Sequence, residues 1–194
     1  IGFSRDGKIA FRQFTSFDGI GGCSDEIIIQ SMITDKILKS IKLDEARGDD
    51  YDIDWDQHCN LEQTWRRERR SIVKYLNRYE IEDNSFGRLN KSKEITSRNG
   101  NYTIKLSKEI RRRYEFDDIN QLQYRLKVYY SGESKTISKD IISAHNIDYL
   151  GYYKSPFEDR VVIVLQFQDT QEGEYSHNGG IITVGCDLHP RSWD

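Results

Sequence analysis

Near its middle the chain reads Leu122-Gln123-Tyr124-Arg125-Leu126-Lys127-Val128-Tyr129-Tyr130, and apolar or aromatic residues occupy positions 122, 124, 126, 128 and 130 without a break. Successive side chains of a strand point to opposite faces, so this period of two predicts a strand with one buried face. The other face carries Gln123, Arg125 and Lys127, and we expect it to be exposed to water. This stretch is the clearest strand signal in the chain.

Further strands are predicted on both sides of it. Arg160–Gln168 is apolar on both faces at its centre, as in an interior strand, and Gly180–Gly185 is its expected antiparallel partner. Lys8–Phe14 reads as a short strand. Ile95–Leu106 reads as a strand, a turn at Asn99-Gly100-Asn101 and a second strand. The second half of the chain is therefore predicted to be rich in sheet.

Helices are predicted mainly in the first half. Isoleucine recurs at positions 29, 33, 37 and 41 behind the N-cap candidate Ser24, which predicts a buried helix to about Leu43. A second helix is predicted from about Leu61 to Tyr79, with apolar residues on one face and arginines elsewhere. Shorter helices are expected after Ser107 and Ser138.

These elements predict the α+β class, in which N-terminal helices precede a largely antiparallel sheet. We expect a mainly helical part over residues 1–85 and a strand-rich part over residues 86–194, or one single domain over 1–194. A chain of 194 residues with 36% hydrophobic residues is long enough to bury a core in either arrangement.

The charges are sorted along the chain. Residues 1–60 carry 7 Lys and Arg against 12 Asp and Glu, residues 61–139 carry 19 against 11, and residues 140–194 carry 3 against 9. A block of one sign indicates either an anionic partner or an acidic patch of the same molecule. The basic middle third is therefore the leading candidate for function.

Part of this basic third resembles a known family. Lys93, Ile95, Gly100, Ile104, Leu106, Lys108, Glu109, Ile110 and Arg111 match the swapped-hairpin DNA-binding domain of the AbrB, SpoVT and MazE proteins. The sequence departs from that pattern where Ser107 replaces a proline and where Glu115 and Asp117 replace glycines. The resemblance covers about residues 91–130, and it implies an intertwined homodimer that grips DNA through the hairpin.

We therefore expect the protein to bind nucleic acid, in the first instance DNA. Cations supply affinity for phosphate independently of sequence, and the amides of Asn99 and Asn101 are able to read base edges. The candidate contacts are Arg66, Arg67, Arg70, Arg98, Asn99, Asn101, Lys105, Lys108, Arg111, Arg112 and Arg113. The competing interpretation is a solvated surface whose arginines pair with the acidic flanks, and a protein interaction module would have the same charge pattern.

An enzyme is the first alternative, and one version of it is a metal-dependent nuclease. Asp50, Asp52, Asp54 and Asp56 share one face of an extended segment, where their mutual repulsion favours a divalent cation such as Mg²⁺. An EF-hand is excluded, because the sixth and twelfth positions counted from Asp50 hold Trp55 and Leu61 instead of glycine and glutamate. The leading hypothesis itself requires no cofactor.

The second version is a cysteine hydrolase. Cys23 follows two glycines at the start of the first predicted helix, where the helix dipole lowers the pKa of a thiol. His177 would act as the base and Asp169 would orient it. A helix-capping or buried structural cysteine is the competing interpretation of Cys23.

Two features bear on location. The three cysteines, Cys23, Cys59 and Cys186, are too few for a disulfide scaffold, which favours a reducing, cytoplasmic setting. No apolar run approaches the roughly 20 residues needed to cross a bilayer, so no membrane partner is expected.

Overall fold

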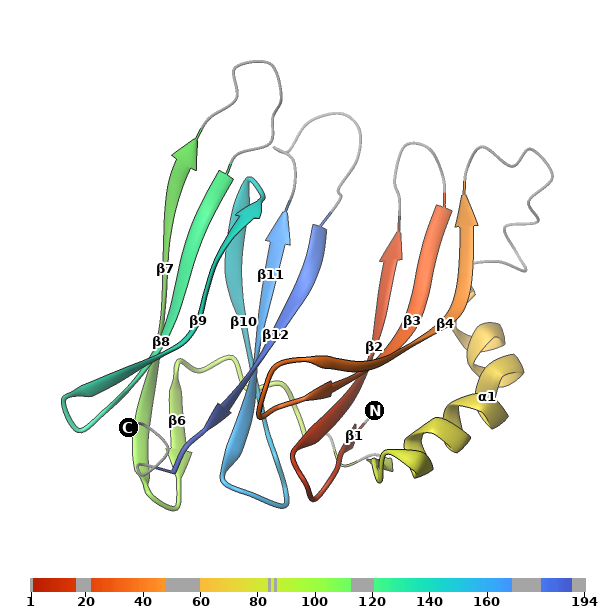
Figure 1. Ribbon diagram of the computed structural model, residues 1–194, viewed down its shortest axis with the longest axis horizontal. Coiled ribbons are helices and arrows are strands. Elements are labelled where there is room, and N and C mark those ends of the chain that lie inside the picture. The colour runs from red at the N-terminus through yellow and green to blue at the C-terminus, as the bar shows by residue number, and fades with distance from the viewer. Residues whose placement is uncertain are drawn as a thin grey trace. The chain divides into compact units, whose positions relative to one another are not determined.

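The computed structural model describes residues 2–16, 22–47, 60–83, 85, 87–112, 121–168 and 179–189. These residues divide into two compact units, an N-terminal unit up to residue 85 and a C-terminal unit from residue 87. The division falls inside the basic third of the sequence, so its first part lies in one unit and its second part in the other. Figure 1 shows the helix and strands of both units.

The N-terminal unit is an antiparallel sheet with the order β4-β3-β2-β1-β5. Its strands are β1 (Gly2–Phe3), β2 (Lys8–Ser16), β3 (Gly22–Ser31), β4 (Ile37–Arg47) and β5 (Glu82–Asp83). The helix α1 (Leu61–Arg78) lies against one face of this sheet (Figure 1). Ile72 and Leu76 of α1 share a buried core with residues of β2, β3 and β4, among them Ile27 and Ile29.

The helix expected over residues 24–43 is wrong, because this segment forms the hairpin of β3 and β4. A spacing of four residues is one helical turn, but it is also two strand periods, so isoleucines four apart fit both structures. Ile29 is fully buried, whereas Ile33 and Ile37 at the hairpin tip are 64% and 61% exposed. Asp35 takes a positive φ of 56° in the turn between the strands.

The C-terminal unit is a sandwich of two antiparallel sheets with the orders β6-β7-β8-β9 and β10-β11-β12. The first sheet consists of β6 (Glu94–Ser97), β7 (Gly100–Arg112), β8 (Gln121–Tyr130) and β9 (Glu133–Ser143), and the second of β10 (Asn146–Lys154), β11 (Arg160–Gln168) and β12 (Gly179–Asp187). Both sheets contribute to one core, with Tyr102, Leu126, Ile163 and Leu165 among its fully buried members. Sheet-on-sheet packing of this kind buries alternate residues of a strand, as in β8, whereas residues 161–165 of β11 are buried on both faces.

The α+β class is therefore wrong, since the described residues are predominantly β with α1 as their one helix. The short helices expected after Ser107 and Ser138 are continuations of β7 and β9. Both segments pair with β8 along its length, and this pairing satisfies their backbone groups better than an isolated helical turn would. The expected strands are confirmed at residues 8–14, 95–106, 122–130 and 160–168, and β12 is confirmed as the antiparallel partner of β11.

A β-bulge in β10 sets the contact between the two sheets of the C-terminal unit. The pairing with β11 shifts between Tyr149 and Gly151, and Gly151 has a φ of +151°. A Cβ atom at residue 151 would lie 2.6 Å from the carbonyl oxygen of Asn90, so the close approach requires glycine. Because of the bulge, Tyr149 and Tyr152 point to the same side of β10 although they are three residues apart.

We expect the matched pair Ile29→Ala and Ile33→Ala to distinguish the hairpin from a buried helix. Ile29→Ala should lower the free energy of unfolding by about 2–5 kcal/mol, because it leaves a cavity in the core. Ile33→Ala should change it by less than about 0.5 kcal/mol, because the side chain is largely exposed. Urea denaturation followed by circular dichroism measures both, and equal large losses would contradict the hairpin.

Candidate nucleic-acid interface

The helix α1 begins and ends where its sequence supplies the caps. The side-chain oxygen of Asn60 accepts hydrogen bonds from the backbone N–H groups of Glu62 and Gln63, at 3.2 and 3.1 Å. Glu62 in the first turn and Arg78 in the last turn both suit the helix dipole. The apolar face packs on the sheet, and the opposite face is therefore presented to solvent.

That exposed face carries a row of cations at every fourth position, formed by Arg66, Arg70, Lys74 and Arg78, which we call the cation row. All four side chains are exposed. Arg66 pairs with Glu62 one turn earlier, but Arg70, Lys74 and Arg78 form no ion pair or hydrogen bond with any described residue. The row spans roughly 18 Å at about 1.5 Å of rise per residue.

Arg67, by contrast, is held in place by its own unit. Its guanidinium donates to the carbonyl oxygen of Leu43 at 3.0 Å, pairs with Glu68 at 3.1 Å and lies 3.9 Å from Asp44. Of the three contacts expected on this helix, Arg66 and Arg70 belong to the cation row, and Arg67 secures α1 to β4. Lys74 and Arg78 were missing from the predicted set, although the spacing of four from Arg70 could have found them.

The hairpin of β6 and β7, predicted as the DNA-reading element, is tied to the opposite sheet. Asp159 accepts hydrogen bonds from the Ser97 hydroxyl at 2.6 Å and from the Asn99 side-chain amide at 2.8 Å. Tyr130 donates to the Asn99 carbonyl at 2.8 Å. The amide of Asn99 is therefore already engaged, whereas Arg98 and Asn101 are exposed and form no side-chain contact with a described residue.

The remaining predicted contacts on β7 differ in their partners. Lys108 donates to the side chain of Asn146 and to the Ile147 carbonyl at 3.1 Å, and it pairs with Asp148 at 3.2 Å. Arg111 contacts Gln123 and Glu109. Lys105 is exposed and has no such partner among the described residues. The side chain of Arg112 and the whole of Arg113 lie outside the described residues.

The strand register brings Lys105 together with three cations that were not in the predicted set. Lys127 lies directly opposite Lys105, and Arg125, two residues before Lys127, lies directly opposite Lys139 of β9. We call Lys105, Arg125, Lys127 and Lys139 the sheet quartet. The alternation within β8 predicted that Arg125 and Lys127 lie on the face exposed to water. The cations opposite them, Lys139 and Lys105, follow only from the strand register, which the sequence of one strand does not determine.

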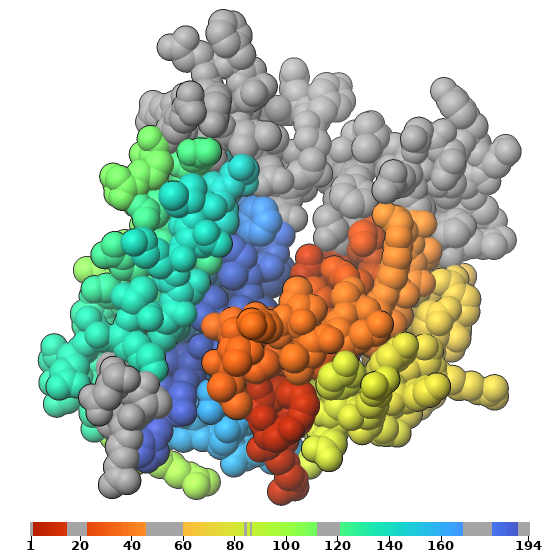
Figure 2. All heavy atoms as spheres, viewed as in Figure 1, coloured from red at the N-terminus to blue at the C-terminus, as the bar shows by residue number. Residues whose placement is uncertain are grey.

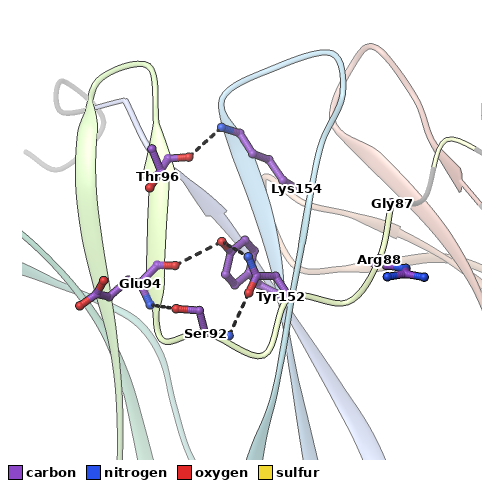
Figure 3. Close-up of a pocket in the computed structure, with 8 residues that line it drawn as sticks. Gly87, Arg88, Ser92, Glu94, Thr96, Tyr152 and Lys154 are labelled. Atoms are coloured by element: carbon purple, nitrogen blue, oxygen red, sulfur yellow. Dashed lines mark hydrogen bonds between the residues drawn. The ribbon is translucent and has the colours of Figure 1, made fainter.

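A groove of about 540 Å³ lies between β6 and β10. It is lined by Gly87, Arg88, Asn90, Ser92, Glu94, Thr96, Tyr152 and Lys154 (Figure 3). Most of its polar groups bind one another. Tyr149 donates to the carbonyl of Ser92 at 2.6 Å, Tyr152 to that of Glu94 at 3.2 Å, and Lys154 to that of Thr96 at 3.0 Å. Three alternate carbonyls of one strand edge are thus each capped by a side chain of β10, so the groove is a structural junction.

Of the residues proposed for the two enzyme alternatives, only Cys23 lies among the described residues. Cys23 lies within β3, is 1% exposed and is disulfide-bonded, so it is not at the start of a helix. The dipole argument for a reactive thiolate therefore does not apply to it. His177, Asp169 and the aspartates Asp50, Asp52, Asp54 and Asp56 lie outside the described residues, and the proposals built on them stay predictions.

The described residues also bear on metal binding and on membrane insertion. They contain no group of three or more histidine, cysteine or carboxylate side chains placed to hold a metal ion. None of their helices has the length and apolar character required to cross a bilayer.

The resemblance to the AbrB, SpoVT and MazE proteins stays a prediction. The segment from Lys108 to Arg111, which the resemblance assigns to the start of a helix, is part of strand β7.

We predict that the capping tyrosines make the fold sensitive to alkali. Burial raises the pKa of Tyr149 and of Tyr152 above the usual value near 10. Their neutral forms therefore contribute stability that is complete below about pH 10 and declines as the pH rises toward the folded-state pKa values. Absorbance at 295 nm should show these phenols ionising late, together with unfolding.

The variant Tyr149→Phe removes the bond to the Ser92 carbonyl and should cost about 1 kcal/mol at neutral pH. It should also weaken the alkaline loss of stability. Tyr129→Phe is the matched control, because Tyr129 is partly exposed and its hydroxyl forms no hydrogen bond with a described residue. Equal behaviour of the two variants would contradict the capping role.

The disulfide predicts a specific alkylation pattern. In protein unfolded without reductant, iodoacetamide should leave Cys23 unmodified, because its sulfur is in a disulfide bond, and should modify Cys186, which is a buried free thiol. After reduction both should react. Peptide mass spectrometry measures the two cysteines separately, and alkylation of Cys23 before reduction would show that the bond is absent.

Comparisons of the chain with family models, with curated proteins and with solved structures found no match.

Proposed function

We propose that the protein binds nucleic acid, and that the cation row of α1 is a principal contact with phosphate. The observation that carries the proposal is that Arg70, Lys74 and Arg78 are exposed and lack a partner among the described residues. A row paired with acidic neighbours would be an ordinary solvated surface. This row has one described carboxylate partner, Glu62.

The energetics of the helix support this interpretation. Like charges four residues apart on a helix are destabilising by about 0.2–0.5 kcal/mol per pair, and the cation row contains three such steps. Opposite charges four residues apart, such as Glu62 and Arg66, would keep the helix surface soluble without this repulsion. A polyanion would relieve the repulsion, because each phosphate contact neutralises one charge and releases condensed counterions.

Duplex DNA is the partner we propose for the cation row. An exposed helix of 18 residues presents its cations along one line, and the phosphates of a duplex form a similar line of closely spaced charges. Phosphate contacts of this kind give affinity and orientation, but they do not read sequence. We therefore expect little preference for base sequence from this surface.

The cellular location is a separate part of the proposal. A cytoplasmic setting matches a nucleic-acid partner, whereas a disulfide at Cys23 is typical of an oxidising compartment. We retain the cytoplasm as the proposed location. Alkylation in cells that are lysed directly into iodoacetamide tests it, and a fully oxidised Cys23 under those conditions would overturn this part of the proposal.

We expect Arg70→Gln combined with Lys74→Gln to weaken binding of a short duplex about tenfold at low salt, because two exposed ionic contacts are lost. The slope of log affinity against log salt should become shallower by about 1.8, since each lost phosphate contact removes about 0.9. Fluorescence anisotropy with a labelled duplex measures both quantities.

The matched control is Lys36→Gln combined with Lys42→Gln, which removes the same charge from the β3–β4 hairpin of the same unit. It should bind nearly as the wild type does. An equal loss in both double variants would mean that only net charge matters. No binding of any nucleic acid by the wild-type protein at low salt would reject the proposed function and favour a protein interaction module.

A further inference from the structure

The outer face of the β6-β7-β8-β9 sheet concentrates positive charge in two neighbouring rows. Lys105 of β7 lies directly opposite Lys127 of β8, and Arg125 of β8 lies directly opposite Lys139 of β9. Lys105, Arg125 and Lys139 are exposed, and Lys127 is partly exposed. Figure 2 shows the atoms of β8 and β9, coloured teal, over a broad part of the surface.

None of the four cations of the sheet quartet has an ion pair or a side-chain hydrogen bond with a described residue. Their same-face neighbours in the pairing are neutral, with Ser107 beside Arg125 and Thr136 beside Lys127. Like charges directly opposite each other on paired strands are destabilising. The sheet therefore holds two repelling pairs next to each other, which stability alone does not explain.

An aromatic side chain lies in the next row of the same face. Tyr129 lies opposite Thr103 of β7 and Ser134 of β9, two residues along β8 from Lys127. It is partly exposed, and it forms no hydrogen bond, aromatic stacking or cation-π interaction with a described residue. The neighbouring Tyr130, in contrast, points inward and stacks on Tyr102 with ring centroids 4.6 Å apart. Tyr129 is not among the partly buried residues that pack against the core of its unit, and part of its side chain remains accessible to a ligand.

We propose that this sheet face binds single-stranded nucleic acid, with Tyr129 stacking on a base and the sheet quartet contacting the adjacent phosphates. The inference rests on the proposed function and adds to it a second surface with a different substrate class. Same-face residues along a strand are about 6.7 Å apart, so Tyr129, Lys127 and Arg125 form a line of one aromatic and two cationic groups along β8. Lys105 and Lys139 flank that line from the neighbouring strands.

The chemistry favours a single strand over the other polyanions. An aromatic ring on the outer face of a sheet is able to stack on unpaired bases, whereas the bases of a duplex are stacked on one another and are out of reach. An anionic membrane would satisfy the cations, but it offers no partner of matching shape to one isolated tyrosine ring. The partly exposed aromatic residues of α1, Trp65 and Tyr75, differ from Tyr129 because they pack against the core of their unit and already have Arg12 and Lys39 over their rings. We therefore assign the two surfaces to different forms of nucleic acid.

The test compares labelled oligo(dT) with a short duplex, using fluorescence anisotropy and the full chain. Lys105→Gln combined with Lys127→Gln should weaken oligo(dT) binding about tenfold and reduce its salt slope by about 1.4, because each single-strand phosphate contact contributes about 0.7. Duplex binding should change less than threefold. Lys91→Gln combined with Lys93→Gln removes the same charge from exposed positions of the same unit and should leave oligo(dT) binding unchanged.

The stacking contact has its own pair of variants. Tyr129→Leu should weaken oligo(dT) binding about tenfold at constant salt slope, because it removes a stacking surface without changing the charge. Tyr129→Phe keeps the ring and should bind as the wild type does. Since these side chains lie outside the core, thermal unfolding should show unchanged or higher stability of the lysine variant, in which one repelling pair is gone.

The outcomes separate this inference from the proposed function. One outcome is that the wild-type protein binds the duplex while the lysine and tyrosine variants bind oligo(dT) as the wild type does. That result would overturn the single-strand surface and leave the proposed function in place. If these variants lose binding to vesicles that contain phosphatidylserine but bind oligo(dT) as before, the sheet face binds a membrane surface and the single-strand proposal is overturned. A wild-type protein that binds neither nucleic acid would reject both proposals.

Discussion

The shared apolar core of the C-terminal unit determines where its charges go. Because Tyr102, Ile104 and Leu126 must face the second sheet, the residues between them are turned outward. Lys105, Arg125 and Lys127 therefore lie on the outer face as a direct result of core packing. The strand register then places cations of β7, β8 and β9 side by side, although they are far apart in the sequence. The positive face and the core both result from the alternation of apolar and polar residues along the same strands.

Hydrogen bonds across the edges of the two sheets fix this arrangement. Tyr149, Tyr152 and Lys154 each donate to one of three alternate carbonyls that begin at Ser92. An uncapped strand edge is a template for association with another chain, and these side chains occupy the acceptors that such a chain would need. The bulge at Gly151 is what aligns the donors, so one glycine supports both the packing of the sheets and the protection of an edge.

The sequence alone predicted the central strands correctly because their alternation of apolar residues admits only one structure. It failed for residues 24–43, where isoleucines four apart are compatible with both a helix and a hairpin, and only the burial of Ile29 beside the exposure of Ile33 separates the two. It also failed after Ser107, where the pairing of β7 with β8 overrides the local signal for a helix start. Local patterns carry no information about which partner strand is present.

The candidate site was predictable to a similar extent. The charge block and the amphipathic pattern of α1 located the exposed arginines of the helix, because a helix determines its own faces. The contacts of Asn99 and Lys108 could not be foreseen, since Asp159 approaches from the connection between β10 and β11 and Asn146 from β10. For the same reason only two members of the sheet quartet, Arg125 and Lys127, could be predicted from the sequence to lie on one exposed strand face.

The burial of Cys186 has a consequence for the chemistry of the other cysteines. Exchange between a thiol and a disulfide requires a thiolate to reach a disulfide sulfur, and Cys186 is 2% exposed inside the core of the C-terminal unit. While that unit stays folded, the bond at Cys23 is shielded from attack by the thiol of Cys186. The order in which the two units open thus decides whether the cysteine pairing survives heating or is scrambled.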